Sequence, residues 1–434
     1  MFSLGSPLAF RYFCTMKRFT TLLIALTLAG AACAQRSEIL FDRLRTLQVV
    51  VADDPNRQPV IALDSDEQLE ISFDDLTHEY CRYTYTVQHC GFDWQPSDEL
   101  FESDFLTSPG NEGVIDDYQQ SMTTSTLYTH YAFRFPNSET RPLISGNYRI
   151  SIMREDENGD LQPAATVCCA VVEPCVAVRA EATTNTDTDW NGAHQQLSMR
   201  VDLKGLNVRD ARREVKTLVM QNRRYDNARL NPAPTSTTGT ALVWDHCRDL
   251  IFEAGNEYRK FEMLNMRAPG MGVESVRWYD PLYHVALFPG ERRRNYLYDE
   301  DRNGQAVIRT DEATDETTDC EYFMAHFTLA MPELDGQDVY VNGRWTHDLF
   351  TPTYRMTYNA AAGAYEAAVL LKQGYYSYQY VAVPHGSDGP GTTAPTEGNF
   401  YQTENEYTIM VYYRPAGARY DRLIGHTTFN FRPQ

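Results

Sequence analysis

Two neighbouring carboxylates are the first residues in this sequence whose type and spacing suggest chemistry. Asp74 and Asp75 end a predicted strand, and His78 and Glu79 follow closely. A carboxylate pair can hydrolyse a glycosidic bond, one group acting as acid and the other as base or nucleophile. Because successive strand residues point to opposite faces, these two side chains should not converge. The pattern favours a turn in which Asp accepts hydrogen bonds from backbone N–H groups.

A second acidic segment resembles the first half of a calcium-binding loop. Asp299, Asp301 and Asn303 place oxygen ligands at alternate positions, and Gly304 supplies a turn. A hard cation such as Ca²⁺ takes oxygen ligands in this arrangement. The twelfth position, where a bidentate Glu is expected, is Thr310. An acidic β-turn without a metal is therefore the competing interpretation.

Arginine and aromatic side chains provide two candidate binding features. Arg292–Arg294 form a local basic cluster, which either contacts an anionic group or lies in a solvated loop. Trp345, Tyr376 and Tyr378 lie in an aromatic-rich region near the C-terminus. Their rings can serve as stacking platforms, but the same spacing also suits the core of a β-sandwich. They are candidate binding residues on this basis.

The sequence contains no standard catalytic motif. It has no G-x-S-x-G elbow, no H-E-x-x-H, no phosphate-binding loop and no dinucleotide fingerprint. The formal net charge of −20 argues against nucleic-acid binding, which needs a basic surface. The sequence therefore predicts a binding protein rather than an enzyme, with no cofactor.

The N-terminus predicts export. Lys17 and Arg18 precede the short apolar run Phe19–Leu28, and an A-x-A cleavage site follows. We expect cleavage after Ala34, so that residues 1–34 comprise an upstream extension and a signal peptide. No later segment is long and apolar enough to predict a transmembrane helix in the mature chain.

The cysteines leave two questions open. Cys33, within the cleavage region, is a competing candidate for lipid attachment. An odd number of cysteines remains after export, and their spacing suits neither a C-x-x-C motif nor a zinc site. Buried thiols, or one or two disulfides, are expected among them. These are Cys81, Cys90, Cys168, Cys169, Cys175, Cys247 and Cys320.

Strand patterns dominate the remainder of the chain. The 434 residues include 28 Tyr and 20 Phe, which favour strands. Residues 82–87 and 127–135 alternate apolar and polar side chains, and Asn158-Gly159 predicts a tight turn between two long strands. The predicted fold class is all-β, with two or three consecutive immunoglobulin-like antiparallel β-sandwich domains.

The same patterns divide the mature chain into three blocks. An N-terminal sandwich is expected over 37–173 and a middle sandwich over 174–310. The acidic, Thr-rich stretch 311–319 is typical of an exposed linker. A C-terminal immunoglobulin-like domain is expected over 321–434.

A set of short segments runs in order along nearly the whole mature chain. They are Ser72–Leu76, Tyr85–Cys90, Asp93-Trp94, Ile115–Tyr118, Ser121, Tyr128–Tyr131, Phe135–Asn137, Ser145–Tyr148, Gln221-Asn222, Gly255–Arg259, Asp301–Gly304, Leu371–Tyr375, Glu397–Phe400, Thr403–Asn405 and Tyr420–Gly425. As an ordered set, these segments resemble the periplasmic plug protein family of the type IX secretion system of Bacteroidota.

The resemblance implies a periplasmic protein at the inner face of the outer membrane. Its implied partner is the large outer-membrane β-barrel translocon, whose pore it would close when no cargo is engaged. Such a plug should bury an interface of at least about 1,000 Å². Exposed aromatic and Arg side chains would be its expected anchors.

Two other functions remain as alternatives. The region from Val341 to Tyr380 resembles the glycogen- and starch-binding immunoglobulin-like (early-set) modules, which implies a periplasmic or surface carbohydrate-binding protein. Only Trp345 is suited to be an exposed platform there. A secreted glycoside hydrolase using Asp74 or Asp75 is the third interpretation.

Overall fold

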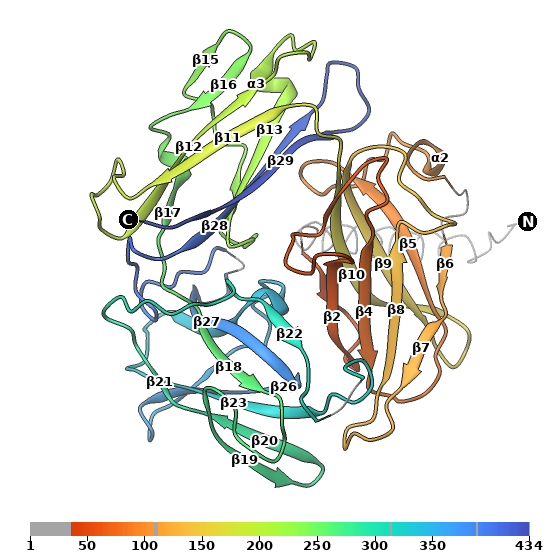
Figure 1. Ribbon diagram of the computed structural model, residues 1–434, viewed down its shortest axis with the longest axis vertical. Helices are drawn as coiled ribbons and strands as arrows, with labels where there is room; N and C mark the ends of the chain where they lie inside the picture. The colour runs from red at the N-terminus through yellow and green to blue at the C-terminus, as the bar shows by residue number, and fades with distance from the viewer. Residues whose placement is uncertain (1–35, 108–111, 313–314, 388, 434) are drawn as a thin grey trace, which may run out of the picture.

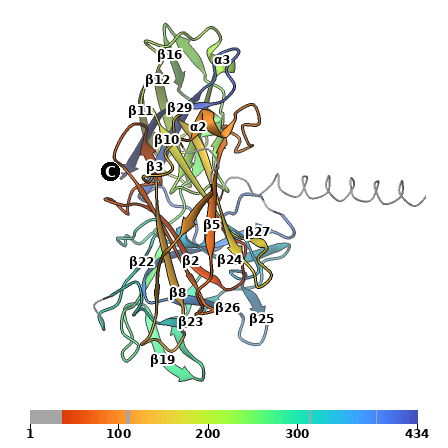
Figure 2. The ribbon, with the colours of Figure 1, turned by 90° about the vertical axis from the view of Figure 1, so that its right-hand side faces the viewer.

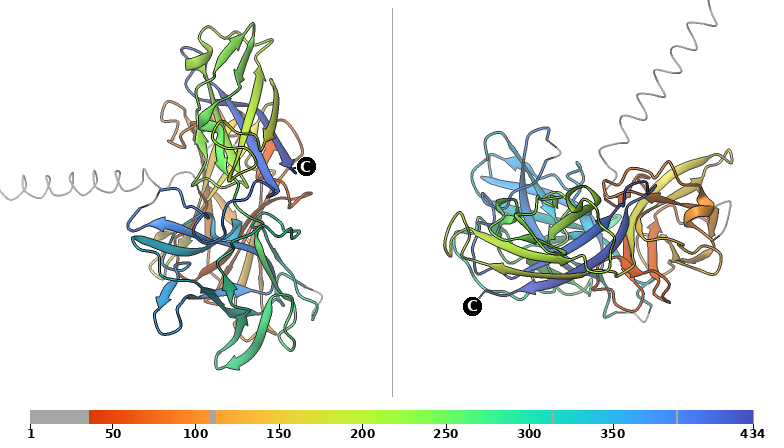
Figure 3. Two further views of the ribbon diagram at one scale, coloured as in Figure 1. Left: turned by 90° about the vertical axis from the view of Figure 1, so that its left-hand side faces the viewer. Right: turned by 90° about the horizontal axis from the view of Figure 1, so that it is seen from above.

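The computed structural model describes residues 36–107, 112–312, 315–387 and 389–433. The predicted signal peptide with its cleavage site, and Cys33, lie outside the described residues. The described chain folds into three β-sandwiches of mainly antiparallel strands, and the all-β prediction is confirmed. In Figure 1 the first sandwich lies on the right, and Figures 2 and 3 show the middle sandwich above the third along the long axis.

The first sandwich contains the strands between residues 38 and 172. One sheet consists of β1 (Glu38–Ile39), β10 (Leu161–Val172), β9 (Gly146–Glu155), β5 (Tyr83–Cys90) and β6 (Glu112–Ile115), with β3 (Val60–Ala62) parallel to β10. The other consists of β2 (Leu44–Val51), β4 (Leu69–Asp75), β8 (Thr129–Phe135) and β7 (Asp117–Gln120). The short helix α2 (Glu102–Phe105) lies in a connecting loop.

Local sequence accounts well for these strands. The alternating segment of β5 turns its tyrosines into the core, where Tyr83 packs against Phe73 and Tyr131. Asn158-Gly159 turns β9 into β10 as predicted, and Gly159 has a φ of 84°, which favours glycine.

The middle sandwich draws on two distant parts of the sequence. Its first sheet consists of β11 (Ala177–Thr183), β12 (His194–Asp202), β16 (Ala241–Trp244), β15 (Ser236–Thr238) and β17 (Ile251–Glu253). Its second consists of β14 (Arg229–Leu230), β13 (Val215–Gln221), β28 (Asn405–Tyr413) and β29 (Arg422–Phe431). The helix α3 (Ala211–Glu214) precedes β13, and the 3-10 helix η1 (Arg248–Leu250) precedes β17.

The third sandwich lies within the sequence of the middle one. One sheet consists of β18 (Arg259–Met263), β27 (Gly374–Pro384), β22 (Ala306–Ile308) and β24 (Gln337–Asn342). The other consists of β19 (Val273–Tyr279), β20 (Leu282–Leu287), β23 (Tyr322–Ala330), β26 (Ala364–Lys372), β25 (Thr357–Asn359) and β21 (Gly290–Glu291). The 3-10 helix η2 (Arg344–Thr346) follows β24.

The strand pairing departs from the expected boundaries at 310 and 321. Strands β18 to β22, expected in the middle domain, pair with strands of the third sandwich. Strands β28 and β29, expected in the C-terminal domain, complete the middle sandwich through the β13–β28 ladder. The domains are therefore interleaved rather than consecutive. The reason is that pairing partners lie up to about two hundred residues apart, which no local pattern specifies.

Candidate binding surfaces and domain junctions

Asp74 and Asp75 belong to two different networks. Asp74 Oδ2 accepts hydrogen bonds from Lys372 Nζ at 2.8 Å and Tyr322 Oη at 2.6 Å, both from the third sandwich. Asp75 instead accepts bonds from Tyr83 Oη at 2.8 Å and from the backbone N–H of Thr77 at 2.9 Å. The predicted divergence of the two carboxylates and the Asp-capped turn at Asp75 are both found. The arrangement joins domains and does not form a convergent acid–base pair.

The Asp74–Lys372 ion pair is buried where the first and third sandwiches meet. The side chains are only 1% and 2% exposed. Burial raises the pKa of Asp74, but the Lys372 charge and bonds from His130 and Lys372 outweigh it and hold that pKa below its usual value. Lys372 Nζ also donates to Thr317 O at 3.0 Å and lies 4.1 Å from the centre of the Tyr128 ring. The pair is well satisfied, so removing either partner should be costly.

The acidic stretch predicted as a linker is fastened to the first sandwich. Its side chains are mostly exposed as expected, but Tyr128 Oη donates to Thr317 O and Cys320 O at 3.1 Å. The adjoining Glu321 carboxylate accepts the backbone N–H groups of Ser125 and Thr126 at 2.6 and 3.1 Å. The stretch therefore contributes to the domain junction.

A second charged cluster joins all three sandwiches. Arg223 holds the Glu406 carboxylate through two bonds of 2.6 and 3.0 Å, and also donates to Asn56 O of the first sandwich. Arg344 of the third sandwich reaches the same carboxylate at 3.4 Å. Burial and the neighbouring Arg223 charge lower the pKa of Arg344 to about 10.

The first and middle sandwiches also share an apolar core. Phe92 packs edge-to-face on Tyr412, with ring centroids 5.2 Å apart, and Tyr412 Oη donates to Asn147 Oδ1 at 2.8 Å. The cluster consists of Val60, Phe92, Ala170, Val172, Leu218, Met220, Met410, Tyr412 and Leu423. Together with the ion pairs, this core holds the sandwiches in a fixed arrangement.

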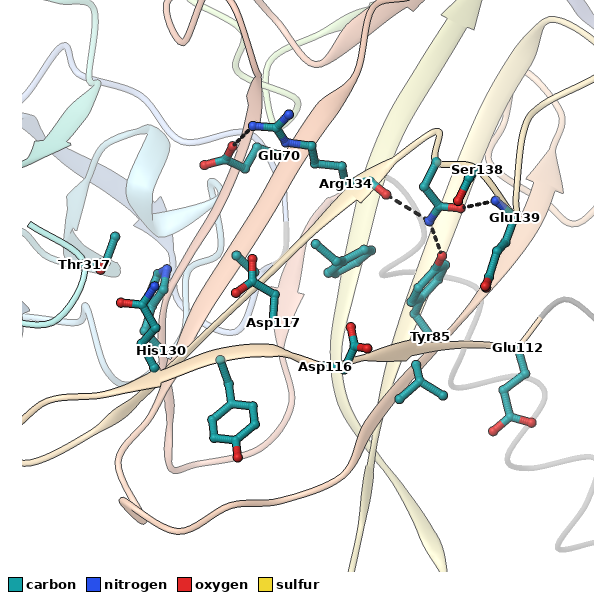
Figure 4. Close-up of a pocket in the computed structure, with 16 residues that line it drawn as sticks. Glu70, Tyr85, Glu112, Asp116, Asp117, His130, Arg134, Ser138, Glu139 and Thr317 are labelled. Carbon is teal, nitrogen blue, oxygen red and sulfur yellow. Dashed lines mark hydrogen bonds and ion pairs between the residues drawn. The ribbon is translucent and has the colours of Figure 1, made fainter.

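An open recess of about 670 Å³ lies at one edge of the first sandwich (Figure 4). The chain crosses there from β6 to β7, and the stacked rings of Tyr85 and Phe133 line it with centroids 4.6 Å apart. Asn137 Nδ2 donates to Tyr85 Oη at 2.7 Å. Five carboxylates line the recess and favour a cationic group over an anionic one. They are Glu70, Glu112, Asp116, Asp117 and Glu139.

The residues of the calcium-like loop already have protein partners. Asp299 accepts a bond of 2.7 Å from Lys260 Nζ. The half-buried Asp301 accepts the backbone N–H groups of Tyr258 and Asn303. Burial raises the pKa of Asp301 to about 6. In the described residues, no group of three or more His, Cys, Asp or Glu side chains is arranged to hold a metal ion.

The candidate aromatic platform is largely part of the third core. Tyr376 and Tyr378 are 3% and 6% exposed, so they are not surface platforms as the sequence suggested. Trp345 packs edge-to-face on Tyr376 at 5.4 Å and donates from Nε1 to Ser377 O at 3.1 Å. The aromatic spacing here serves packing of the third core, and the sequence alone could not distinguish core packing from stacking on a ligand.

The three-arginine run is divided between the interior and the surface. Arg293 is half-buried, with its Nε 3.6 Å from Glu397 and its Nη1 bonded to Glu257 O. Burial lowers the pKa of Arg293. Arg292 and Arg294 are exposed. The two outer arginines are therefore available to a partner, while the middle one fixes the loop.

Glu257 should make stability depend on pH. Burial raises the pKa of this carboxyl to about 7, although Tyr296 Oη donates to it at 2.8 Å. The unfolded chain releases this proton near pH 4.3, so the contribution of Glu257 to stability falls between about pH 4.3 and 7. We expect Glu257→Gln to raise the melting temperature at pH 8, with the gain shrinking towards pH 4. An equal change in melting temperature at pH 8 and at pH 4 would contradict this expectation. Glu291→Gln, at an exposed site, is the control.

The seven described cysteines are all thiols. Six are buried, and Cys175 is exposed. Cys90 and Cys168 pack with Trp94 in a small cluster, and burial raises the pKa of Cys90 to about 11. The interpretation as small buried thiols therefore describes most of them. No helix in the part of the chain that the structure describes is long and apolar enough to span a membrane.

Comparisons with known proteins agree with this architecture. The family model for the first domain of type 9 secretion system plug proteins matches residues 44–171, which lie within the first sandwich. A crystal structure of a hypothetical protein from Parabacteroides merdae ATCC 43184 is 41% identical, with a TM-score of 0.88. The match covers 92% of this chain and 100% of that one. A search of curated proteins found no match. Residues 44–171 are therefore identified as a type 9 secretion system plug protein 1st domain.

Proposed function

We propose that this protein is a non-catalytic, periplasmic component of the type IX secretion system. It binds the periplasmic opening of the outer-membrane translocon and closes its pore in the absence of cargo. The family match over residues 44–171 is the observation that carries this proposal. Export would follow cleavage after Ala34, as the N-terminal sequence predicts.

The domain junctions support this function physically. A plug over a wide pore must resist deformation, because any gap between its domains would leak. Here the sandwiches are joined by the buried Asp74–Lys372 pair, by the Glu406 cluster and by a shared apolar core. Close-packed interiors of this kind have low compressibility and transmit force as a unit.

A pull-down from solubilised outer membranes tests the interaction. The bait is the tagged mature chain beginning at Gln35, and the recovered proteins are identified by mass spectrometry. Recovery of a very large outer-membrane β-barrel is the expected result. Absence of any barrel, together with retention of the bait on glycan resin, would overturn the proposal in favour of carbohydrate binding.

A further inference from the structure

A recess of about 200 Å³ opens where the three sandwiches meet. Its walls come from β2 of the first sandwich, the loop after β13 of the middle one, and β22 and η2 of the third. Figure 1 shows β2 beside β22 at this junction. An apolar cavity of about 150 Å³ can hold benzene, so there is room here for one ring-sized group and a carboxylate. The lining of this junction recess includes Val49, Val50, Arg223, Ala306, Arg344 and Trp345.

Positive charge gathers in the junction recess, although the whole chain has a net charge of −20. Among the described residues, four arginines and a single carboxylate, Asp348, line it. This carboxylate already accepts hydrogen bonds from Asn342 Nδ2 at 3.1 Å and the Tyr225 N–H at 3.2 Å, and burial raises its pKa. Burial lowers the pKa of the lining His347 to about 4, so this imidazole is neutral at pH 7. The recess therefore favours an anionic group. The four are Arg36, Arg57, Arg223 and Arg344.

Two of these arginines have no carboxylate of their own among the described residues. Arg223 holds Glu406 through two bonds of 2.6 and 3.0 Å, and Arg344 reaches the same carboxylate at 3.4 Å. The buried Arg344 Nε has no hydrogen-bond partner in the described chain, which is uncommon for a buried donor. Arg36 Nη1 donates to the backbone oxygen of Asp348 at 2.5 Å rather than to a side-chain carboxylate. A second carboxylate in the recess would therefore complete the pairing of charge.

Strand β2 presents an open edge to the recess. It is the end strand of its sheet, and among the described strands it pairs only with β4. Gln48, Val49 and Val50 all line the recess, although successive side chains of a strand point to opposite faces. The recess therefore follows the edge of the strand rather than one face. Backbone N–H and C=O groups at such an edge can pair with an added extended chain.

Trp345 provides a fixed apolar wall. Its indole is half-buried, packs edge-to-face on Tyr376 at 5.4 Å and donates from Nε1 to Ser377 O at 3.1 Å. A ring that is fixed before binding loses little conformational entropy when a ligand packs against it. Pro55 and Pro59 of the first sandwich also line the recess. Arginines, a strand edge and apolar groups thus meet in one place.

We propose that the junction recess binds the carboxyl terminus of an extended polypeptide whose last side chain is apolar or aromatic. The terminal carboxylate pairs with Arg344 and Arg36, and the last side chain packs against Trp345. The preceding backbone adds to the edge of β2. A small free acid would leave this edge unused, so the recess fits a chain terminus better. The inference goes beyond the proposed function and does not rest on it.

A matched pair of peptides tests the site. The fluorescein-labelled peptide GSTVTVF is prepared with a free carboxyl terminus and, as the control, with an amidated one. Fluorescence anisotropy is recorded as each peptide is titrated with the purified mature chain. We expect saturable binding of the free-acid peptide. The amidated peptide should bind at least about tenfold more weakly, because it cannot make charge-assisted hydrogen bonds to arginine.

Arg344→Gln tests which residue recognises the carboxylate. It should lower affinity for the free-acid peptide at least about tenfold and change affinity for the amidated peptide little, whereas a purely structural disturbance would weaken both alike. Arg344→Lys keeps the charge and should retain part of the preference for the free acid. Arg355→Gln, at an arginine 52% exposed outside the recess, should bind both peptides like wild type. Circular dichroism checks folding, and Arg36→Gln provides the same comparison if Arg344→Gln does not fold.

Three results would overturn the inference. Equal affinity for the two peptides would show that the recess does not recognise a carboxylate. An unchanged preference for the free acid in both Arg344→Gln and Arg36→Gln would place the peptide elsewhere on the protein. Absence of saturable binding of the free-acid peptide up to about 1 mM would exclude a chain terminus as the occupant. In that case a rise in melting temperature with phenylacetate would assign the recess to small free acids.

Discussion

Replacing Lys372 with methionine is expected to lower the free energy of unfolding by about 3–5 kcal/mol. The substitution leaves the Asp74 carboxylate, 1% exposed, without its ion-pair partner at the junction of the first and third sandwiches. Burying an unpaired charge costs far more than losing a surface pair. Urea unfolding followed by tryptophan fluorescence measures the change.

The control is a surface pair. Arg134→Met removes a partner of Glu70 at 3.4 Å, with side chains 58% and 43% exposed, and should cost less than about 1 kcal/mol. The difference in unfolding free energy between wild type and Lys372→Met should also shrink below about pH 4. The pKa of Asp74 is lower in the folded chain, so its stabilisation is present above the unfolded pKa of about 3.9 and is lost as pH falls through the folded value. A similar loss of unfolding free energy in Lys372→Met and Arg134→Met would show that Asp74 and Lys372 do not form a buried ion pair at the junction.

Removing residues 405–434 is expected to abolish folding of the middle sandwich. This deletion takes away β28 and β29, which form half of one of its sheets. The exposed core would include Leu197, Val219 and Trp244. Limited proteolysis with mass spectrometry should find residues 174–256 degraded, while the intact chain resists.

A point variant tests the same assignment without truncation. Ile409 is fully buried in the middle core, and Ile409→Ala should cost about 2–5 kcal/mol. Asn430→Ala, at an exposed position of β29, should change stability little. A protease-resistant middle sandwich in the truncated chain, or a neutral Ile409→Ala, would restore the simpler division into consecutive domains.

The strands could be predicted from sequence more reliably than their partners. Alternation identified β5 and β8, and Asn158-Gly159 identified the β9–β10 hairpin, because these signals are local. Strand β28 also has a local β-forming sequence, but its partner β13 lies nearly two hundred residues away. One signal was available in the sequence: residues 407–413 are apolar or β-forming without alternation, which is typical of a strand covered on both faces, and the structure buries all of them.

The functional residues were harder to predict for the same reason. Asp74 and Lys372 are 298 residues apart, so nothing near Asp74 in the sequence indicates an ion pair between domains. Tyr376 and Trp278 belong to similar aromatic strands, yet one is buried and the other exposed. Only the packing of the third sandwich decides between core and surface for such residues.

Pore closure is the central claim, and a leak measurement tests it most directly. The purified barrel translocon is reconstituted in a planar bilayer, and the mature protein is added to its periplasmic side while ion current is recorded. We expect the current to fall to the level of the bare membrane, to return when the protein is washed out, and to be unaffected by addition to the opposite side. An open pore with the protein demonstrably bound would contradict the proposal that this protein is the plug.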